Sequence, residues 1–66
     1  MQISVNGEMR TFEGVADVAA LVAELGLDPR KVAVECNLEI VPRSLYGDTA
    51  LADGDRVEIV TFIGGG

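Results

Sequence analysis

The residue in this sequence that could take part in chemistry is Gly66, through its terminal carboxylate. Residues 57–63 have the pattern of a β-strand and lead directly into Gly64, Gly65 and Gly66. Glycine weakens a strand and loses the most conformational freedom on folding, so three in a row do not serve stability. They would form a thin tail that fits a narrow channel in another protein. We therefore predict that residues 63–66 are a flexible functional tail, with a frayed end as the alternative.

Other residues that could carry out chemistry are few. The 66 residues include no His and one Cys, which excludes a Ser-His or Cys-His nucleophile pair, a structural zinc site and a four-Cys iron–sulfur cluster. Residues 53–55, Asp-Gly-Asp, lack the remaining positions of a calcium loop, so a plain turn is the favoured interpretation. Cys36 could relay a persulfide, but a small, half-buried core residue is the interpretation that we prefer. We expect no bound metal and no bound cofactor.

Length, composition and charge favour a carrier or binding module over an enzyme. A chain of 66 residues is too short to enclose a deep active site, and an apolar fraction of 48% is typical of a folded globule. The net charge of −6 comes without a basic patch, so we expect neither nucleic acid nor a membrane as a partner. No apolar run is long enough to span a bilayer, and no secretory signal is evident. A single Cys favours a cytoplasmic location.

The chain begins with a predicted hairpin and continues with a predicted helix. Residues 1–5 alternate apolar and polar side chains, and Asn6-Gly7 is a strong hairpin signal before a return strand at 9–12. From residue 14 to 25 the apolar side chains recur at helical spacing. We predict a helix of about three turns there, with Gly14 as N-cap, Asp17 in the first turn and Gly26 in the left-handed position after the last turn.

The rest of the chain is predicted to be mostly extended. Residues 32–36 form a predicted central strand, residues 37–39 a turn or bulge, and residues 40–41 a short extended segment before Pro42. Residues 43–49 are predicted to be irregular, with a turn at 46–48, and residues 56–62 form the last strand. The first and last strands can lie side by side in a mixed sheet. We therefore predict an α+β fold of the ubiquitin-like β-grasp type, with four to five strands and one helix across one face, as a single domain over residues 1–66.

Several stretches of the sequence together resemble a known family. They are residues 26–29 after the helix (Gly-Leu-Asp-Pro), 32–35 (Val-Ala-Val-Glu), 40–44 (Ile-Val-Pro-Arg-Ser), 53–60 (Asp-Gly-Asp-Arg-Val-Glu-Ile-Val) and the three terminal glycines. As an ordered set over the whole chain, they resemble ThiS, the family of small sulfur carriers of thiamine biosynthesis. Cys36 departs from the resemblance, because a basic residue is more often expected at its position.

The resemblance implies a sequence of reactions on Gly66. A ThiF-type adenylyltransferase would use ATP to convert the Gly66 carboxylate into an acyl adenylate. Sulfur from cysteine, supplied through a cysteine desulfurase, would displace AMP and leave a thiocarboxylate. Thiazole synthase (ThiG) would then accept that sulfur into the thiazole ring. In this scheme the chain is a protein cosubstrate and not an enzyme, and ATP is consumed by the partner.

The last strand is the predicted docking element. If Val57 and Ile59 face the helix, the period of two directs Glu58, Val60 and Phe62 outward. Exposed Val60 and Phe62 would form an apolar docking patch, unless Phe62 folds over the sheet edge and completes the core. The predicted partner-binding residues are Glu58, Val60, Phe62, Ile63, Gly64 and Gly65.

Two other functions stay open on the sequence alone. A sulfur carrier of another pathway, such as the small subunit of molybdopterin synthase, shares this predicted fold and tail. A non-covalent β-grasp interaction module would not use the tail at all, and its partner binding would survive removal of the three glycines.

Overall fold

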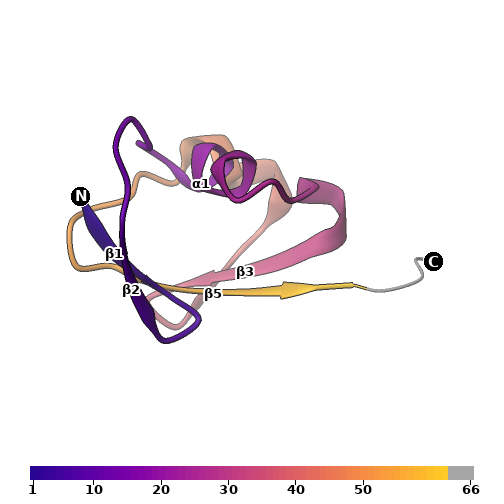
Figure 1. The fold of residues 1–66 in the computed structure, drawn as a ribbon. Helices are drawn as coiled ribbons and strands as arrows, with labels where there is room; N and C mark the ends of the chain where they lie inside the picture. Colours follow the sequence, from indigo (N-terminus) through magenta and orange to yellow (C-terminus); the bar gives the residue numbers. More distant parts are fainter. Residues whose placement is uncertain (63–66) are drawn as a thin grey trace.

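Residues 1–62, the part of the chain that the computed structural model describes, form a five-stranded sheet with an α-helix across one face (Figure 1). The strand order is β2-β1-β5-β3-β4. The elements along the chain are β1 (Gln2–Val5), β2 (Glu8–Thr11), α1 (Val18–Glu24), the 3₁₀ helix η1 (Pro29–Lys31), β3 (Val32–Cys36), β4 (Glu39–Val41), the 3₁₀ helix η2 (Arg43–Asp48) and β5 (Arg56–Thr61).

The last strand, β5, is the centre of the sheet. It pairs in parallel with β1 on one side and antiparallel with β3 on the other. The outer strands β2 and β4 are the antiparallel hairpin partners of β1 and β3. The predicted mixed sheet, with the first and last strands side by side, is therefore confirmed. Strand β3 is an inner strand, as its apolar sequence indicates.

Both hairpins turn in the same way, through two residues with positive φ. The first turn has Asn6 at φ 51° and Gly7 at φ 85°, which confirms the predicted hairpin. The second has Asn37 at φ 52° and Leu38 at φ 71°. A two-residue turn of type I′ requires positive φ at both positions, because this geometry matches the twist of the flanking strands.

The helix begins later than the sequence predicts. Its N-cap is Asp17, whose carboxylate accepts a hydrogen bond from the Ala20 amide at 2.8 Å, so the predicted Gly14 cap is wrong. Backbone hydrogen bonds from Leu51 to Ala16 and from Val18 to the Thr49 carbonyl hold the preceding residues in an extended path. An aspartate also caps a helix better than a glycine does. Helix α1 is therefore seven residues long instead of about three turns.

The helix end matches the prediction. Gly26 has φ 73° and follows the C-cap residue Leu25. Its amide donates to the Ala23 carbonyl at 3.0 Å, and the Leu27 amide donates to the Val22 carbonyl at 3.1 Å. These two hydrogen bonds define a Schellman motif, in which a left-handed glycine closes the last turn. Leu27 packs against the core and supplies the apolar contact of the motif.

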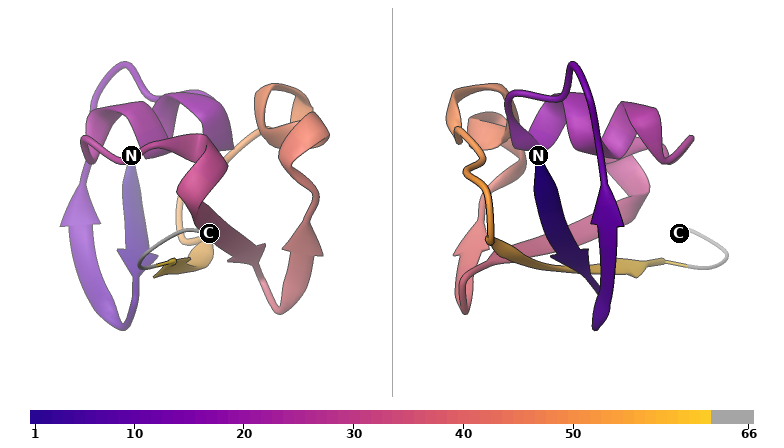
Figure 2. Two further views of the ribbon diagram at one scale, coloured as in Figure 1. Left: turned by 90° about the vertical axis from the view of Figure 1, so that its right-hand side faces the viewer. Right: turned by 60° about the vertical axis from the view of Figure 1, so that its left-hand side comes forward.

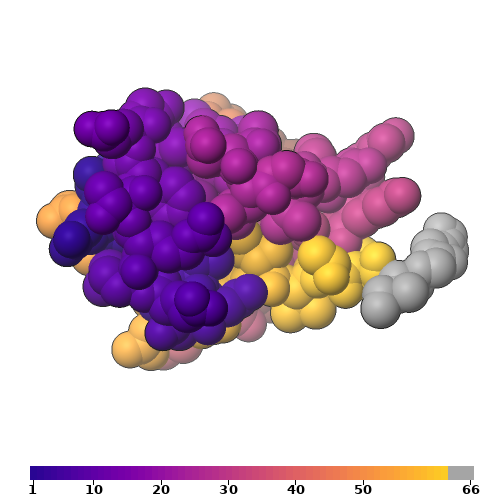
Figure 3. Space-filling model, in the orientation of Figure 1, coloured from indigo at the N-terminus to yellow at the C-terminus, as the bar shows by residue number. Residues whose placement is uncertain are grey.

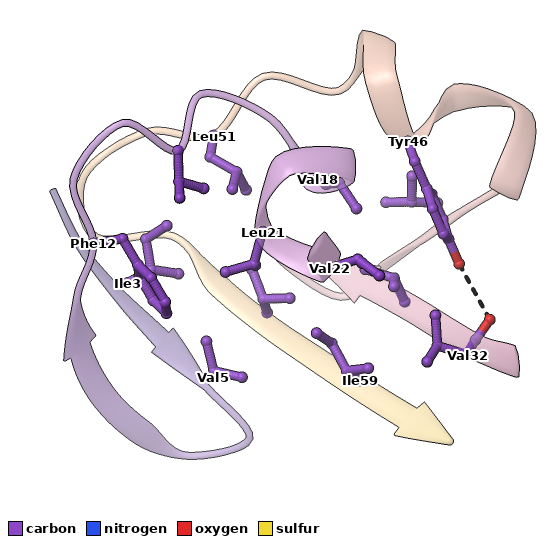
Figure 4. Close-up of a cluster of buried hydrophobic side chains, with 14 residues drawn as sticks. Ile3, Val5, Phe12, Val18, Leu21, Val22, Val32, Tyr46, Leu51 and Ile59 are labelled. Carbon is purple, nitrogen blue, oxygen red and sulfur yellow. Dashed lines mark hydrogen bonds between the residues drawn. The ribbon is translucent and has the colours of Figure 1, made fainter. Parts of the chain in front are cut away.

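Between β4 and β5 the chain is more regular than predicted. Instead of an irregular segment with a turn at 46–48, Arg43–Asp48 forms a 3₁₀ helix. Its Tyr46 side chain is buried, and the hydroxyl donates to the Val32 carbonyl at 3.2 Å (Figure 4). The local sequence does not reveal that Tyr46 packs against β3, which is distant in the sequence, and so it does not predict the 3₁₀ helix. The predicted turn at 53–55 is present, with Gly54 at φ 89°.

The core lies between the sheet and the helix, and η2 covers the side of the core that is formed by β3 (Figures 2 and 4). Helix α1 contributes Val18, Leu21 and Val22, and the strands contribute their helix-facing side chains. The buried side chains of residues 1–62 are all apolar or aromatic: Ile3, Val5, Phe12, Val15, Val18, Leu21, Val22, Val32, Val34, Val41, Tyr46, Leu51, Val57 and Ile59. Within residues 1–62, no helix covers the opposite face of the sheet (Figure 1).

Candidate functional site

Strand β5 presents opposite sets of side chains to the two faces of the sheet. Val57 and Ile59 are 0% and 7% exposed and face the helix. Glu58 is half-buried on the other face, and Val60 is 61% exposed. Phe62, one residue after the strand, is 56% exposed and does not fold over the core. The outward placement of these three side chains agrees with the predicted alternation, whereas their role in docking stays a prediction.

The open face of the sheet carries a shallow groove of about 390 Å³. Glu58 and Val60 line it from β5, Ala33 and Glu35 from β3, and Ile40 from β4. The strand registers place Ala33 opposite Val60, and Glu35 opposite both Glu58 and Ile40. The structure therefore adds side chains of β3 and β4 to the patch that the sequence predicts on β5.

Two asparagine side chains hold β5 in place. The Asn6 amide donates to the Ile59 carbonyl at 3.1 Å, and its oxygen accepts from the Ile59 amide at 2.7 Å. The Asn37 side chain accepts from the Arg56 amide at 3.0 Å, while its own backbone amide donates to the Arg56 carbonyl at 2.7 Å. Each asparagine thus replaces a strand residue at the point where the neighbouring strand has ended. The sequence pattern predicts only the turn at Asn6 and not these two hydrogen bonds with Ile59.

The pairing of β5 continues to Phe62, the last described residue. The Phe62 amide donates to the Lys31 carbonyl at 2.8 Å, which extends the pairing with the β3 side by one residue. The yellow surface at the end of β5 lies away from the indigo N-terminal residues (Figure 3). The predicted site residues Ile63, Gly64, Gly65 and Gly66 lie outside the described residues.

Within the described residues, the structure records one ion pair, between Arg30 and Asp28 at η1. Arg30 and Asp28 flank the start of η1, with 2.9 Å between a guanidinium nitrogen and a carboxylate oxygen. The hydrogen bonds from the Arg30 side chain and backbone lower the pKa of Asp28 to about 2. The pair is exposed, so it fixes the local turn into β3 more than it stabilises the whole fold.

Cys36 is half-buried and packs against the core, which confirms its interpretation as a small core residue. Its sulfur lies 3.9 Å from a carboxylate oxygen of Asp55. Burial, and then the negative charge of Asp55, raise the pKa of the Cys36 thiol. Because the thiolate is the nucleophile, this environment disfavours a sulfur-relay role for Cys36.

The aspartates of the 53–55 turn are used as hydrogen-bond acceptors within the fold. Asp53 accepts from the Gln2 amide at 2.6 Å, and Asp55 accepts from the Ala52 amide at 2.8 Å. Within residues 1–62, no group of three or more His, Cys, Asp or Glu side chains gathers as a possible metal site. The same range contains no helix long and apolar enough to cross a membrane.

Comparison with known proteins identifies the relatives of this chain. It is 34% identical to the sulfur carrier protein ThiS of Bacillus subtilis (strain 168), over 97% of this chain and 98% of that protein. The crystal structure of the thiamine biosynthesis protein ThiS from Geobacter metallireducens superimposes with a TM-score of 0.84 at 36% identity, covering all of both chains. This likeness confirms the predicted β-grasp fold.

A higher identity is found within a longer protein. The chain is 59% identical over all 66 residues to a thiazole synthase of Paramagnetospirillum magneticum (strain ATCC 700264 / AMB-1). It spans only 20% of the length of that relative and of a second thiazole synthase that it matches. The sequence model of the ThiS family matches residues 3–66. The chain therefore belongs to the ThiS family.

Proposed function

We propose that this chain accepts sulfur on the carboxylate of Gly66 and donates it, as a thiocarboxylate, for the thiazole ring of thiamine. The observation that carries the proposal is the ThiS family match, which spans residues 3–66 and so includes the three glycines. The exposed Val60 and Phe62 at the end of β5 support it, since they offer an apolar docking surface beside the residues that lead to Gly66.

The chemistry explains why a carrier with a glycine tail is needed. A carboxylate is a poor electrophile, because its negative charge repels nucleophiles. Adenylation by a ThiF-type enzyme, with ATP, replaces that charge by a good leaving group, so that sulfur bonds to the carbonyl carbon as AMP departs. Three glycines extend over at most about 10 Å, enough to enter a cleft while the globule stays outside. The globule contributes positioning, which can supply a large part of a rate enhancement.

The partners follow from the same reaction scheme. A cysteine desulfurase supplies the sulfur, and thiazole synthase receives it from the thiocarboxylate. Support for the second partner comes from thiazole synthases of which about a fifth aligns with this entire chain. Ile63, Gly64 and Gly65 are the proposed contacts inside the partner clefts, while Glu58, Val60 and Phe62 are proposed to bind outside them.

The decisive experiment measures the intact mass of the 66-residue chain after incubation with a ThiF-type adenylyltransferase, ATP, a cysteine desulfurase and cysteine. We expect a mass gain equal to the exchange of one oxygen for one sulfur atom. Fragmentation of the product should place the added mass on Gly66.

The matched controls are a variant that lacks Gly66 and the variant Gly66→Ala. Both leave residues 1–62 untouched, so both should fold normally, and neither should gain the mass. Sulfur uptake by the shortened variant would contradict the proposal. So would the absence of any gain in an enzyme mixture that loads the Bacillus subtilis ThiS protein, and the chain would then be a non-covalent interaction module.

A further inference from the structure

We propose that the groove on the open face of the sheet binds a basic side chain, an Arg or a Lys, of the enzyme that activates Gly66. The carboxylates of Glu35 and Glu58 would receive its positive charge, and Ile40 and Val60 would pack around its stem. This inference deepens the proposed function and rests on it, because the occupant is the enzyme that acts on Gly66.

Two glutamates face each other across neighbouring strands in this groove. The antiparallel register of β3 and β5 places Glu35 directly opposite Glu58, and both side chains are half-buried in the same groove. Side chains at directly opposed positions have Cβ atoms about 5 Å apart, and like charges there are destabilising. A pair of opposed carboxylates therefore weakens the sheet unless a cation lies between them.

The chain does not provide that cation within residues 1–62. The ion pair that the structure records in this range joins Arg30 to Asp28 at η1, away from the groove. Arg56 is on the same face of β5 as Glu58, two residues earlier, but it lines a different hollow together with Asn37 and Leu38. The two formal negative charges in the groove are thus left for an external cation.

The apolar side chains around the pair make the site suited to a long basic side chain. Ile40, on β4 opposite Glu35, is 77% exposed, and Val60, two residues after Glu58 on β5, is 61% exposed. Arg and Lys pack their methylene stems on apolar surface while the charged head reaches carboxylates. Exclusion of water by Ile40 and Val60 would also strengthen the attraction between the charges. A guanidinium could donate to both carboxylates at once because its donors form a fixed fork.

Other occupants of this face fit the charges less well. A second copy of this chain, docked face to face about a two-fold axis, would bring two pairs of glutamates together, and like charges across an interface are costly. An anionic membrane surface would be repelled by the same carboxylates and by the net charge of −6. A basic protein segment with apolar neighbours is the partner whose chemistry complements the groove.

The groove lies partly on β5, the strand that leads to the predicted docking residues, so a contact there can orient that strand on the partner. Glu58 lies on the strand that leads to Phe62, about 13 Å further along an extended chain. A charge contact at Glu58 and Glu35 would therefore fix the direction in which β5 points, while Val60 and Phe62 lie between this contact and the partner cleft. We expect the contact to affect encounter and docking rather than the chemical step.

The test compares the wild-type chain with Glu35→Gln, Glu58→Gln and the double variant. Binding to the ThiF-type adenylyltransferase that modifies the wild-type chain is measured by surface plasmon resonance at several salt concentrations. We expect the double variant to bind about tenfold more weakly, mainly through a slower association rate, with a shallower dependence on salt. In the mass assay, KM for the carrier should rise while kcat stays unchanged.

A matched control removes two charges elsewhere. Glu8 and Glu13 are exposed and do not line the groove, so the double variant Glu8→Gln and Glu13→Gln should bind within about twofold of wild type. Ile40→Thr keeps the β-branched strand residue but removes apolar contact, and should weaken binding several-fold. These comparisons separate a specific contact from the effect of overall charge.

Stability measurements keep the test free of folding artefacts. Because Glu35 and Glu58 repel each other, the double glutamine variant should unfold at a higher temperature than wild type, even as it binds more weakly. Unchanged binding of that variant to the adenylyltransferase would overturn the inference. Sedimentation experiments that show self-association of the chain through this face would also overturn it. If the wild-type chain gains sulfur while the groove variants bind the adenylyltransferase as tightly as wild type, the inference fails and the proposed carrier chemistry stands.

Discussion

At the scale of single residues, Asn6 has two structural tasks. It occupies a left-handed turn position at φ 51°, and its side chain makes two hydrogen bonds with the backbone of Ile59. The Asn-Gly pair predicts the turn, because asparagine and glycine tolerate positive φ. The two hydrogen bonds could not be predicted, since Ile59 is 53 residues away along the chain and meets Asn6 only once β1 and β5 pair.

Replacement of this side chain should therefore destabilise the fold measurably. We expect Asn6→Ala to lower the free energy of unfolding by about 3–4 kcal/mol, from two hydrogen bonds worth about 1 kcal/mol each and about 1–2 kcal/mol of strain for alanine at positive φ. Urea unfolding monitored by circular dichroism measures the change. Asn6→Gly keeps the turn geometry and should lose only the hydrogen-bond part, so equal stability of all three proteins would refute this account.

At the scale of elements, the two hairpin turns form an internal comparison. They share asparagine at the first position and positive φ at both, but the second position is Gly7 in one and Leu38 in the other. Leu38 is 76% exposed, so little burial compensates for its backbone strain. A leucine in this conformation costs about 1–2 kcal/mol.

Leu38→Gly should accordingly stabilise the chain. Relief of the strain exceeds the extra freedom that glycine gives the unfolded chain, about 0.4–1 kcal/mol, so we expect a net gain of about 0.5–1 kcal/mol. Thermal and urea unfolding measure it. The reverse exchange, Gly7→Leu, should destabilise, because a side chain there meets open space but must adopt φ 85°. A loss of stability in Leu38→Gly would contradict this expectation and would show that contacts of the Leu38 side chain stabilise the fold by more than the backbone strain costs.

The helix shows where a sequence pattern misleads at this scale. Apolar residues at helical spacing from 15 to 25 predict a helix that begins at Gly14, yet α1 begins after Asp17. Val15 is buried all the same, from a segment held by hydrogen bonds to residues 49–51. In the sequence, a buried residue before the N-cap can fall at the same three- or four-residue spacing as the buried residues inside the helix. Only the long-range hydrogen bonds to residues 49–51 show that Val15 lies outside the helix.

At the scale of the whole molecule, topology was predictable and register was not. Alternating strands, a hairpin signal and one helical stretch suffice for a mixed sheet with the first and last strands adjacent. The groove depends on Glu35 lying opposite Glu58, which is a matter of register between strands 20 residues or more apart in sequence. A shift by one residue would bring a different pair together. This is why Glu58 was predicted to face outward while Glu35 was not connected with it.

The net charge of −6 in so small a molecule also has a measurable effect. Mutual repulsion of carboxylates opposes the compact state, and salt screens it over about 10 Å at 0.1 M. We expect the melting temperature at neutral pH to rise by about 2–4 °C between low and physiological salt, equivalent to about 0.5 kcal/mol. Differential scanning calorimetry measures this. Near the isoelectric point of about 4.2 the effect should vanish, and the same rise at both pH values would contradict the electrostatic explanation.

The central position of β5 has a mechanical consequence. A pull along this strand from its Phe62 end acts parallel to the strand, across its bonds to β1, β3 and the two asparagine side chains. In this shear geometry the force is shared by all the hydrogen bonds of the strand. A hairpin strand that is pulled from its open end would instead break its hydrogen bonds one after another. Strand β5 is held on one side by β1 and the Asn6 side chain, and on the other side by β3 as far as Thr61. Under the proposed function, an enzyme that pulls on the residues after Phe62 would load these hydrogen bonds together and would not peel the strand from the sheet.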